Sequence, residues 1–165
     1  MSTATPLYGT PTAMTITLAS LASDTNLLVG RESTALDQGG TLDAIDVILG
    51  GKITTGTSPT ASRQIEVWVY GTWDGTEYTA ACTGSDAGKT VTAESKVAMK
   101  LACILPTNST SDTAYTFLVG SVARLFGGIV PSKFGVFCVH NTGVNLNATS
   151  GNHEVYYTTV KYESA

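Results

Sequence analysis

Residues 64–70 read Gln-Ile-Glu-Val-Trp-Val-Tyr, and this stretch decides the fold class. Its β-branched residues are Ile65, Val67 and Val69. They recur with the period of two that a β-strand produces. Because such side chains pack well on a pleated sheet, we expect them to face the core. Trp68 and Tyr70 then point to the opposite face, where a second layer of core, a protein interface or a platform for sugars are all open interpretations.

The same alternation recurs along the chain in short segments that Gly, Pro, Ser and Thr separate. Further strands are predicted over residues 14–18, 42–55, 97–105, 114–119, 134–139 and 154–162. Residues 134–139 are apolar on both faces, which indicates a central strand covered on both sides. Many short strands with turns between them predict an all-β, jelly-roll-like β-sandwich.

The ends and turns of this sandwich carry their own signals. Residues 1–13 contain Pro6, Gly9 and Pro11 and are predicted to form an extended N-terminal arm on a single domain of residues 14–165. Docking of the arm on a neighbour and simple fraying are both open. Gly50-Gly51 predicts a bulge or bend inside its strand. Residues 121–126 predict one helical turn, ended by Gly127-Gly128.

Composition narrows the classes of function. The chain has 165 residues and a net charge of −4, which argues against binding to nucleic acid. The chain contains no apolar stretch of the ~18 residues that a membrane span needs, and its N-terminus lacks the pattern of a secretory signal. Three cysteines, an odd number, predict free thiols and synthesis in a reducing compartment.

The residues that could perform chemistry are scattered. Residues 84–90 are one residue short of a phosphate-binding loop. Cys138 and His140 share a strand face, and we interpret them as a buried thiol beside a hydrogen-bonded imidazole, because the spacing of a zinc site is missing. The sequence contains no Gly-x-Ser-x-Gly motif, which would carry a nucleophilic serine for His140 or His153 to activate as a base. We therefore predict a protein that is not an enzyme and uses no metal or cofactor.

Six stretches of the chain carry a resemblance to a known family. They are TITLASLA (15–22), LLVGRESTA (27–35), GGKITTGTSPT (50–60), EVWVY (66–70), SVARLFGG (121–128) and HNTGVNLNA (140–148). Together they resemble the small virion structural proteins of tailed bacteriophages. The resemblance implies a virion component assembled in the bacterial cytoplasm, either a head decoration (cement) protein that bridges capsid subunits or a tail or collar component.

The expected partners are the major capsid protein or other virion proteins, and further copies of the chain in a homo-oligomer. The residues expected to make these contacts are Pro6, Tyr8, Pro11, Trp68, Tyr70 and Trp73. A carbohydrate-binding module for host attachment is a separate hypothesis. It predicts that Trp73 and Tyr78 lie exposed on a concave sheet.

Overall fold

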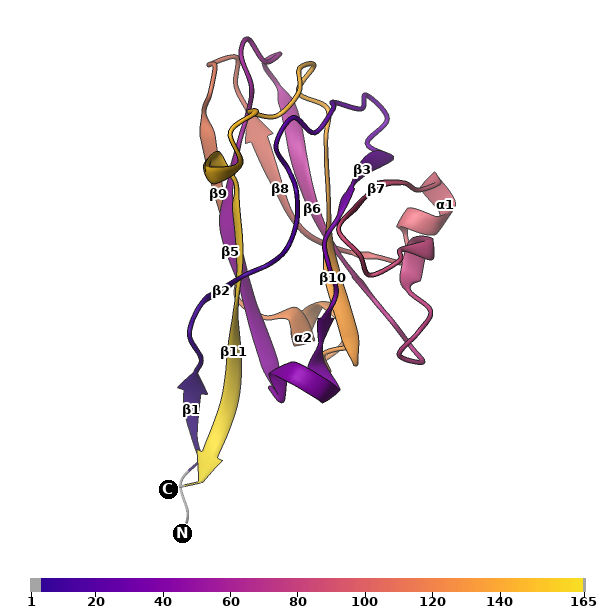
Figure 1. The fold of residues 1–165 in the computed structure, drawn as a ribbon, viewed down its shortest axis with the longest axis vertical. Helices are drawn as coiled ribbons and strands as arrows, with labels where there is room; N and C mark the ends of the chain where they lie inside the picture. The colour runs from indigo at the N-terminus through magenta and orange to yellow at the C-terminus, as the bar shows by residue number, and fades with distance from the viewer. Residues whose placement is uncertain (1–3, 165) are drawn as a thin grey trace.

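The computed structural model describes residues 4–164 and shows two antiparallel sheets packed face to face (Figure 1). Sheet A consists of β1 (Ala4–Tyr8), β11 (Glu154–Ser164), β5 (Asp46–Thr54) and β9 (Ala114–Val119) in that order, with β2 (Thr12–Ala13) also paired to β11. Sheet B consists of β7 (Ala87–Thr90), β3 (Val29–Glu32), β10 (Lys133–His140), β6 (Arg63–Gly71) and β8 (Lys100–Thr107), with β4 (Leu36–Asp37) on β10.

The strands pair in a nested order along the chain. The first strands, β1 and β2, pair with the last strand, β11, and β3 and β4 pair with β10. Inside these, β5 pairs with β9 and β6 pairs with β8. This nesting results when one long antiparallel hairpin is rolled into two sheets, and it is the arrangement of a jelly roll. The predicted all-β, jelly-roll-like sandwich is therefore confirmed, and β7 is an addition in the connection between β6 and β8.

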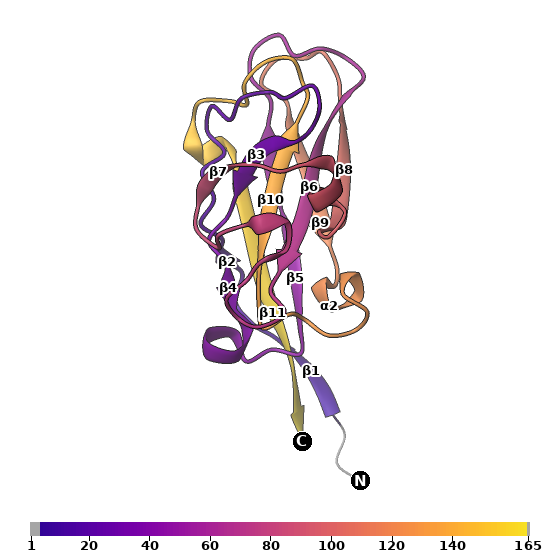
Figure 2. The same ribbon diagram turned by 90° about the vertical axis from the view of Figure 1, so that its right-hand side faces the viewer.

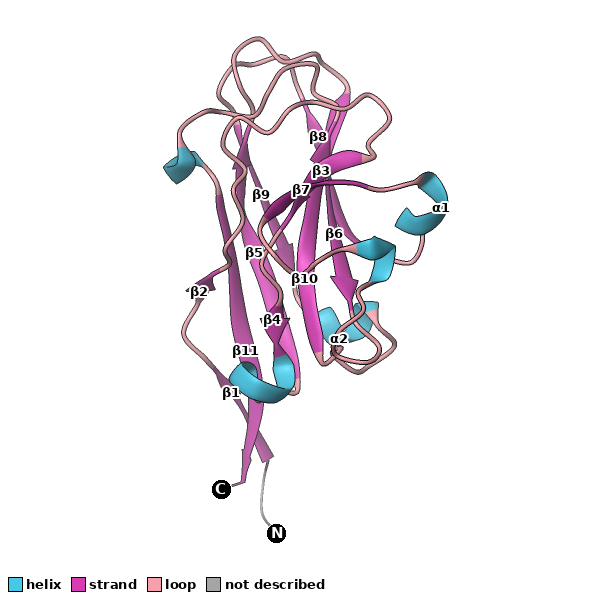
Figure 3. Ribbon diagram, turned by 45° about the vertical axis from the view of Figure 1, so that its right-hand side comes forward, coloured by secondary structure: helices cyan, strands magenta, loops and turns pink. Residues whose placement is uncertain are grey.

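Helical turns lie at the periphery of the sandwich (Figure 3). They are α1 (Ala93–Lys96), α2 (Val122–Leu125), the π-turn η1 (Gln38–Leu42) and the 3-10 turns η2 (Thr79–Ala81) and η3 (Ser150–Asn152). The turn predicted over residues 121–126 is confirmed as α2, which the Ser121 hydroxyl caps by accepting from the Arg124 amide. The strand predicted from Val97 begins instead at Lys100, because a capping box between Thr92 and Ser95 holds α1.

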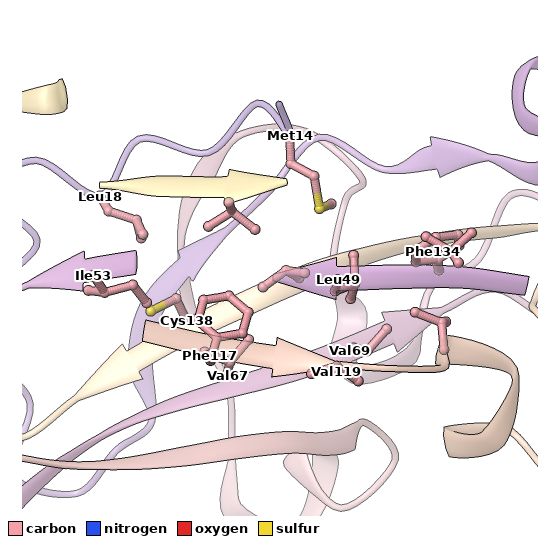
Figure 4. Packing of buried hydrophobic residues seen from close by; sticks show 14 of the residues in the cluster. Met14, Leu18, Leu49, Ile53, Val67, Val69, Phe117, Val119, Phe134 and Cys138 are labelled. Carbon is pink, nitrogen blue, oxygen red and sulfur yellow. The ribbon is translucent and has the colours of Figure 1, made fainter. Parts of the chain in front are cut away.

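The main core fills the space between the two sheets (Figure 4). The branched set of β6 is buried there as predicted. Strand β10 is central in sheet B and is buried along almost its whole length, which confirms the doubly covered strand. Its side chains therefore contact two layers, the core between the sheets and a second layer outside sheet B.

The second layer comes from the connection between β6 and β8, residues 72–99, which folds over the outer face of sheet B (Figure 2). It is a separate apolar cluster. Its buried members are Tyr70, Phe137 and Val139 from the sheet and Ala80, Cys82, Val91 and Met99 from the connection. The chain itself thus covers the outer face of sheet B over β10 and much of β6, whereas Ile104 on the edge strand β8 stays exposed.

Two smaller features complete the fold. The bulge predicted at Gly50-Gly51 is wrong, because the register of β5 runs without interruption against both β11 and β9. Gly51 is needed because β11 approaches the backbone of β5 closely at this position: a methyl group added at Gly51 would overlap the carbonyl oxygen of Glu154. Within residues 4–164, no helix has the length and apolar character that a bilayer span requires.

Candidate functional site

The outer face of sheet A differs from that of sheet B, because no helix or long connection within residues 4–164 folds across it (Figure 1). The register of the strands brings a set of outward-facing residues together in rows. We call this set the outer strip; its members are Leu118, Gly50, Tyr156, Ile48, Thr158, Val160, Tyr8, Tyr162 and Pro6. Leu118 is 76% exposed, Tyr8 61% and Tyr162 64%. Exposed apolar patches of this kind mark interaction sites on soluble proteins.

The outer strip carries little charge. Asp46 lies opposite Val160, but its carboxylate accepts from the amides of Val47 and Ala123, 2.7 and 2.8 Å away, and is thereby engaged by the chain itself. The ion pair between Lys52 and Glu154, 3.2 Å apart, bounds the strip at one end. A partner would therefore desolvate mainly apolar groups and hydroxyls there, which costs less than desolvating charges.

At its other end the strip continues onto a two-stranded ribbon of β1 and the last residues of β11, which projects beyond the sandwich (Figure 1). Tyr8 and Tyr162 are exposed on one face of this ribbon and Leu7 on the other. Residues 4–8 of the predicted arm are therefore a paired strand, and Pro11 is exposed in the segment that leads to β2. Residues 1–3 of the arm lie outside the described part of the chain.

The structure separates the aromatic residues that the sequence grouped. Trp73 is 71% exposed in the loop after β6. Trp68 is half-buried, with its indole N–H donating to Glu66 over 2.8 Å and the Lys96 ammonium 4.6 Å from the ring centre. The prediction that Tyr70 contacts a partner is wrong, because Tyr70 is fully buried and its hydroxyl donates to the Ser33 carbonyl over 2.6 Å.

The geometry that a sugar platform needs is also missing from this region. Tyr78 packs edge-on against Tyr70, with the ring centres 5.6 Å apart, and is only partly exposed. Trp73 therefore has no exposed partner ring at Tyr78 with which to stack on a sugar. The expectation of an exposed pair formed by Trp73 and Tyr78 is wrong.

The remaining candidates for chemistry have structural roles. The imidazole of His140 lies 3.0 Å from the Leu21 carbonyl and 2.9 Å from the Thr142 hydroxyl, and burial lowers its pKa to about 4. Cys138 beside it on β10 is buried too, and burial raises the pKa of its thiol. The interpretation of a buried thiol near a hydrogen-bonded imidazole is confirmed.

The phosphate-loop-like segment forms an ion pair instead. Asp86 Oδ1 lies 2.6 Å from Arg31 Nε, and its other oxygen accepts from the Thr17 hydroxyl over 2.6 Å. These contacts hold the pKa of Asp86 below its usual value although burial opposes them. Among the described residues, no three His, Cys, Asp or Glu side chains gather closely enough to hold a metal ion.

Sequence reasoning missed most of the outer strip. The alternation in residues 114–119 could have placed Leu118 on the outward face of its strand, and that in residues 154–162 could have done the same for Tyr156 and Tyr162. Alternation could not have shown that this face is uncovered. Comparison of the chain with protein-family models, with curated proteins and with solved structures found no match. Function is therefore argued from this surface.

Proposed function

We propose that the protein is a structural subunit of a larger assembly and that it docks through the outer strip. The sequence resemblance points to a tailed-phage virion, and within it we propose the role of a head decoration protein that bridges capsid subunits. The observation that carries the proposal is the contrast between the two outer faces. The chain covers the outer face of sheet B over β10 and much of β6 with its own residues 72–99, and leaves the outer strip of sheet A open.

A shell-binding protein gains from a surface of this kind. Burying apolar area contributes about 25 cal/mol per Å², and a specific interface takes about 800 Å² from each partner. Contacts of modest area suffice on a shell, because symmetry repeats them and neighbouring sites act together. The outer strip supplies such area on a rigid sheet, where little conformational entropy is lost on docking.

The two ends of the sandwich suggest the orientation of the docked molecule. The ribbon of β1 and β11 projects from one end, where exposed Tyr8 and Tyr162 can anchor a contact (Figure 1). The loops of residues 56–62, 108–113 and 141–152 are at the opposite end and are rich in Ser, Thr, Asn and Gly. We place the ribbon toward the assembly and these polar loops toward solvent.

The test is cosedimentation of the purified protein with separated heads and tails of the phage whose genome encodes it. The wild-type protein is expected to sediment with heads. Tyr156→Lys and Tyr162→Lys, which place charges in the outer strip, are expected to reduce bound protein at least tenfold. Thr57→Lys in the polar loops is the matched control and is expected to bind like the wild type.

The other outcomes discriminate between proposals. Binding to tails alone would replace the decoration role by the tail or collar role, with the same docking surface. Absence of binding to either particle would overturn the virion proposal. Equal binding of the wild-type protein and both strip variants would overturn the assignment of the surface.

A further inference from the structure

The free edges of the two sheets are protected very unevenly. An edge strand presents unpaired N–H and C=O groups that can pair with another chain, and natural proteins block such edges with proline, charge or short strands. Sheet A ends in β9 on one side and in β1 with the two-residue β2 on the other; sheet B ends in β8 on one side and in β7 with the two-residue β4 on the other. Three of these four edges carry one of these devices.

Proline blocks the edge at β1 and β8. The Gly9 amide donates to the Thr159 carbonyl over 2.9 Å. Because successive residues of a strand direct their N–H and C=O groups to opposite sides, the backbone groups of Leu7 point toward β11 and those of Pro6 point toward the free edge. In sheet B the Asn141 amide donates to the Gln64 carbonyl over 3.1 Å, so the backbone polar groups of Gln64 point toward β10. Its partner on β8, Pro106, therefore directs its backbone toward the free edge. Each proline removes an N–H from the edge that it faces. Strand β7 is only four residues long and contains a lysine.

Strand β9 has no such protection. Its sequence, Ala-Tyr-Thr-Phe-Leu-Val, contains no proline, glycine or charge. The Thr55 amide donates to the Thr113 carbonyl over 3.0 Å, and this sets the phase of the ladder with β5. By alternation, Ala114, Thr116 and Leu118 direct their N–H and C=O groups to the free edge. Among the described residues, β5 is the only strand that pairs with β9.

The charges around this edge are arranged with opposite signs at its two ends. Asp112 precedes β9, and Arg124 in α2 follows it. Both are exposed, and neither takes part in an ion pair within the described residues; one carboxylate oxygen of Asp112 accepts from the Asn147 side-chain amide over 2.6 Å, and its charge is not neutralised. Lys100 adds a second positive charge beside Arg124, in the groove between the ends of β8 and β9. A second strand with the same arrangement of charges, paired antiparallel, would bring its negative end beside the positive end of β9 and its positive end beside the negative end of β9.

We propose that β9 pairs antiparallel with β9 of a second copy of this chain, about a twofold axis that passes midway between the two copies of Thr116. Thr116 then faces Thr116 of the second copy, and Leu118 faces the small side chain of Ala114. Asp112 lies opposite Gly120 of the second copy, next to the α2 turn that carries Arg124. A second copy fits best because a twofold interface brings the same surface of both copies together. At this edge the charges, the sizes of the opposed side chains and the outward-facing N–H and C=O groups all match their counterparts in the second copy.

The pairing has a consequence for docking. It joins the two copies of sheet A into one continuous sheet, so the two outer strips lie on the same side. A dimer would then engage two sites on an assembly at once and gain from effective concentration. The pairing itself does not depend on which assembly the protein joins, so its failure and the failure of the proposed function are distinguishable.

The first test is the molar mass of the purified full chain by light scattering, at high micromolar concentration. The wild-type protein is expected to have twice the mass of the chain. Thr116→Pro removes an N–H that faces outward and leaves the ladder with β5 intact, so it is expected to be a folded monomer. Thr116→Val keeps the N–H and is the matched control, expected to remain dimeric. A monomeric wild-type protein would overturn the proposal, as would a folded Thr116→Pro variant that stays dimeric.

A second test does not depend on how well the proline variant folds. Directly opposed residues in a hydrogen-bonded antiparallel pair have Cα atoms about 5.5 Å apart, which suits a disulfide. Thr116→Cys is therefore expected to form a disulfide-linked dimer under mild oxidation, whereas Thr158→Cys, on the same outer face but away from the edge, is not. Equal cross-linking of both variants would contradict the twofold pairing.

Charge exchange tests the register. Arg124→Asp is expected to weaken the dimer at least tenfold, and addition of Asp112→Arg is expected to restore it. A double variant no stronger than Arg124→Asp alone would overturn this register.

Discussion

The ammonium group of Lys96 lies 2.7 Å from a carboxylate oxygen of Glu66, and the two side chains are only 12% and 9% exposed. The indole N–H of Trp68 donates to the same carboxylate oxygen, and Lys96 also donates to the Leu27 carbonyl over 2.7 Å. This cluster fastens the connection between β6 and β8 to the outer face of sheet B. It therefore helps to keep that face covered and unavailable to partners.

Lys96→Met is expected to destabilise the protein by about 3 kcal/mol, because it leaves the Glu66 carboxylate buried without a counter-charge. The free energy of unfolding in urea measures the loss. Adding Glu66→Gln to Lys96→Met is expected to recover most of it. Lys52→Met removes one partner of the exposed pair with Glu154 and is the control, with an expected change below about 1 kcal/mol. Equal losses for the two lysine variants would contradict the role of burial.

Stability is expected to fall as the pH drops from about 6.5 to about 4. Burial lowers the pKa of His140 from 6.5 to about 4, so in this interval the unfolded chain binds a proton that the folded chain does not. At about 1.4 kcal/mol for each pKa unit, the loss from this group approaches about 3 kcal/mol at the acidic end. Unfolding in urea at several pH values measures the total loss, and NMR titration of the imidazole isolates His140. A His140 resonance that titrates near pH 6.5 in the folded protein would contradict this assignment.

Gly51→Ala and Gly50→Ala are expected to differ although the glycines are neighbours. A methyl group at Gly51 would overlap the backbone of Glu154 and force β5 and β11 apart, which costs about 1–3 kcal/mol or more. A methyl group at Gly50 would meet nothing closer than the Phe117 carbonyl oxygen at 3.2 Å. Thermal unfolding of both variants measures the difference. A Gly50→Ala variant as unstable as Gly51→Ala would argue against the close approach at Gly51.

The three thiols are expected to react slowly in the folded protein. Burial raises the pKa of Cys82 to about 12, with the nearby charge of Glu32 adding to it, and raises that of Cys103 to about 11. The reactive thiolate is therefore scarce at pH 8. Cys103 and Cys138 both lie opposite Val67 on the two flanking strands, too far apart for a disulfide. Titration with a thiol reagent before and after unfolding measures this protection, and rapid labelling of the folded protein would contradict it.

The sequence by itself determined the six long strands β5, β6 and β8 to β11 and the inner faces of these strands. The strand predicted over residues 14–18 is wrong, because that segment is irregular, and the short strands β3, β4 and β7 were not predicted. Alternation placed Ile65, Val67 and Val69 in the core, and the apolar run of residues 134–139 identified the central strand. The turn over residues 121–126, ended by Gly127-Gly128, was predicted and is the one-turn helix α2. These properties are local, because the period of a strand and the caps of a helix depend on neighbours in the chain.

The tertiary structure alone decided which outer face stays open. Tyr70 and Leu118 each alternate with buried residues in a strand, yet Tyr70 lies under residues 72–99 and Leu118 lies on an uncovered sheet. The same holds for Pro6, Pro106 and Thr116, whose backbones face the free edges only because of the phase of their pairing with distant strands. Coverage and pairing phase depend on where remote segments come to lie, and no pattern within a single strand encodes that placement.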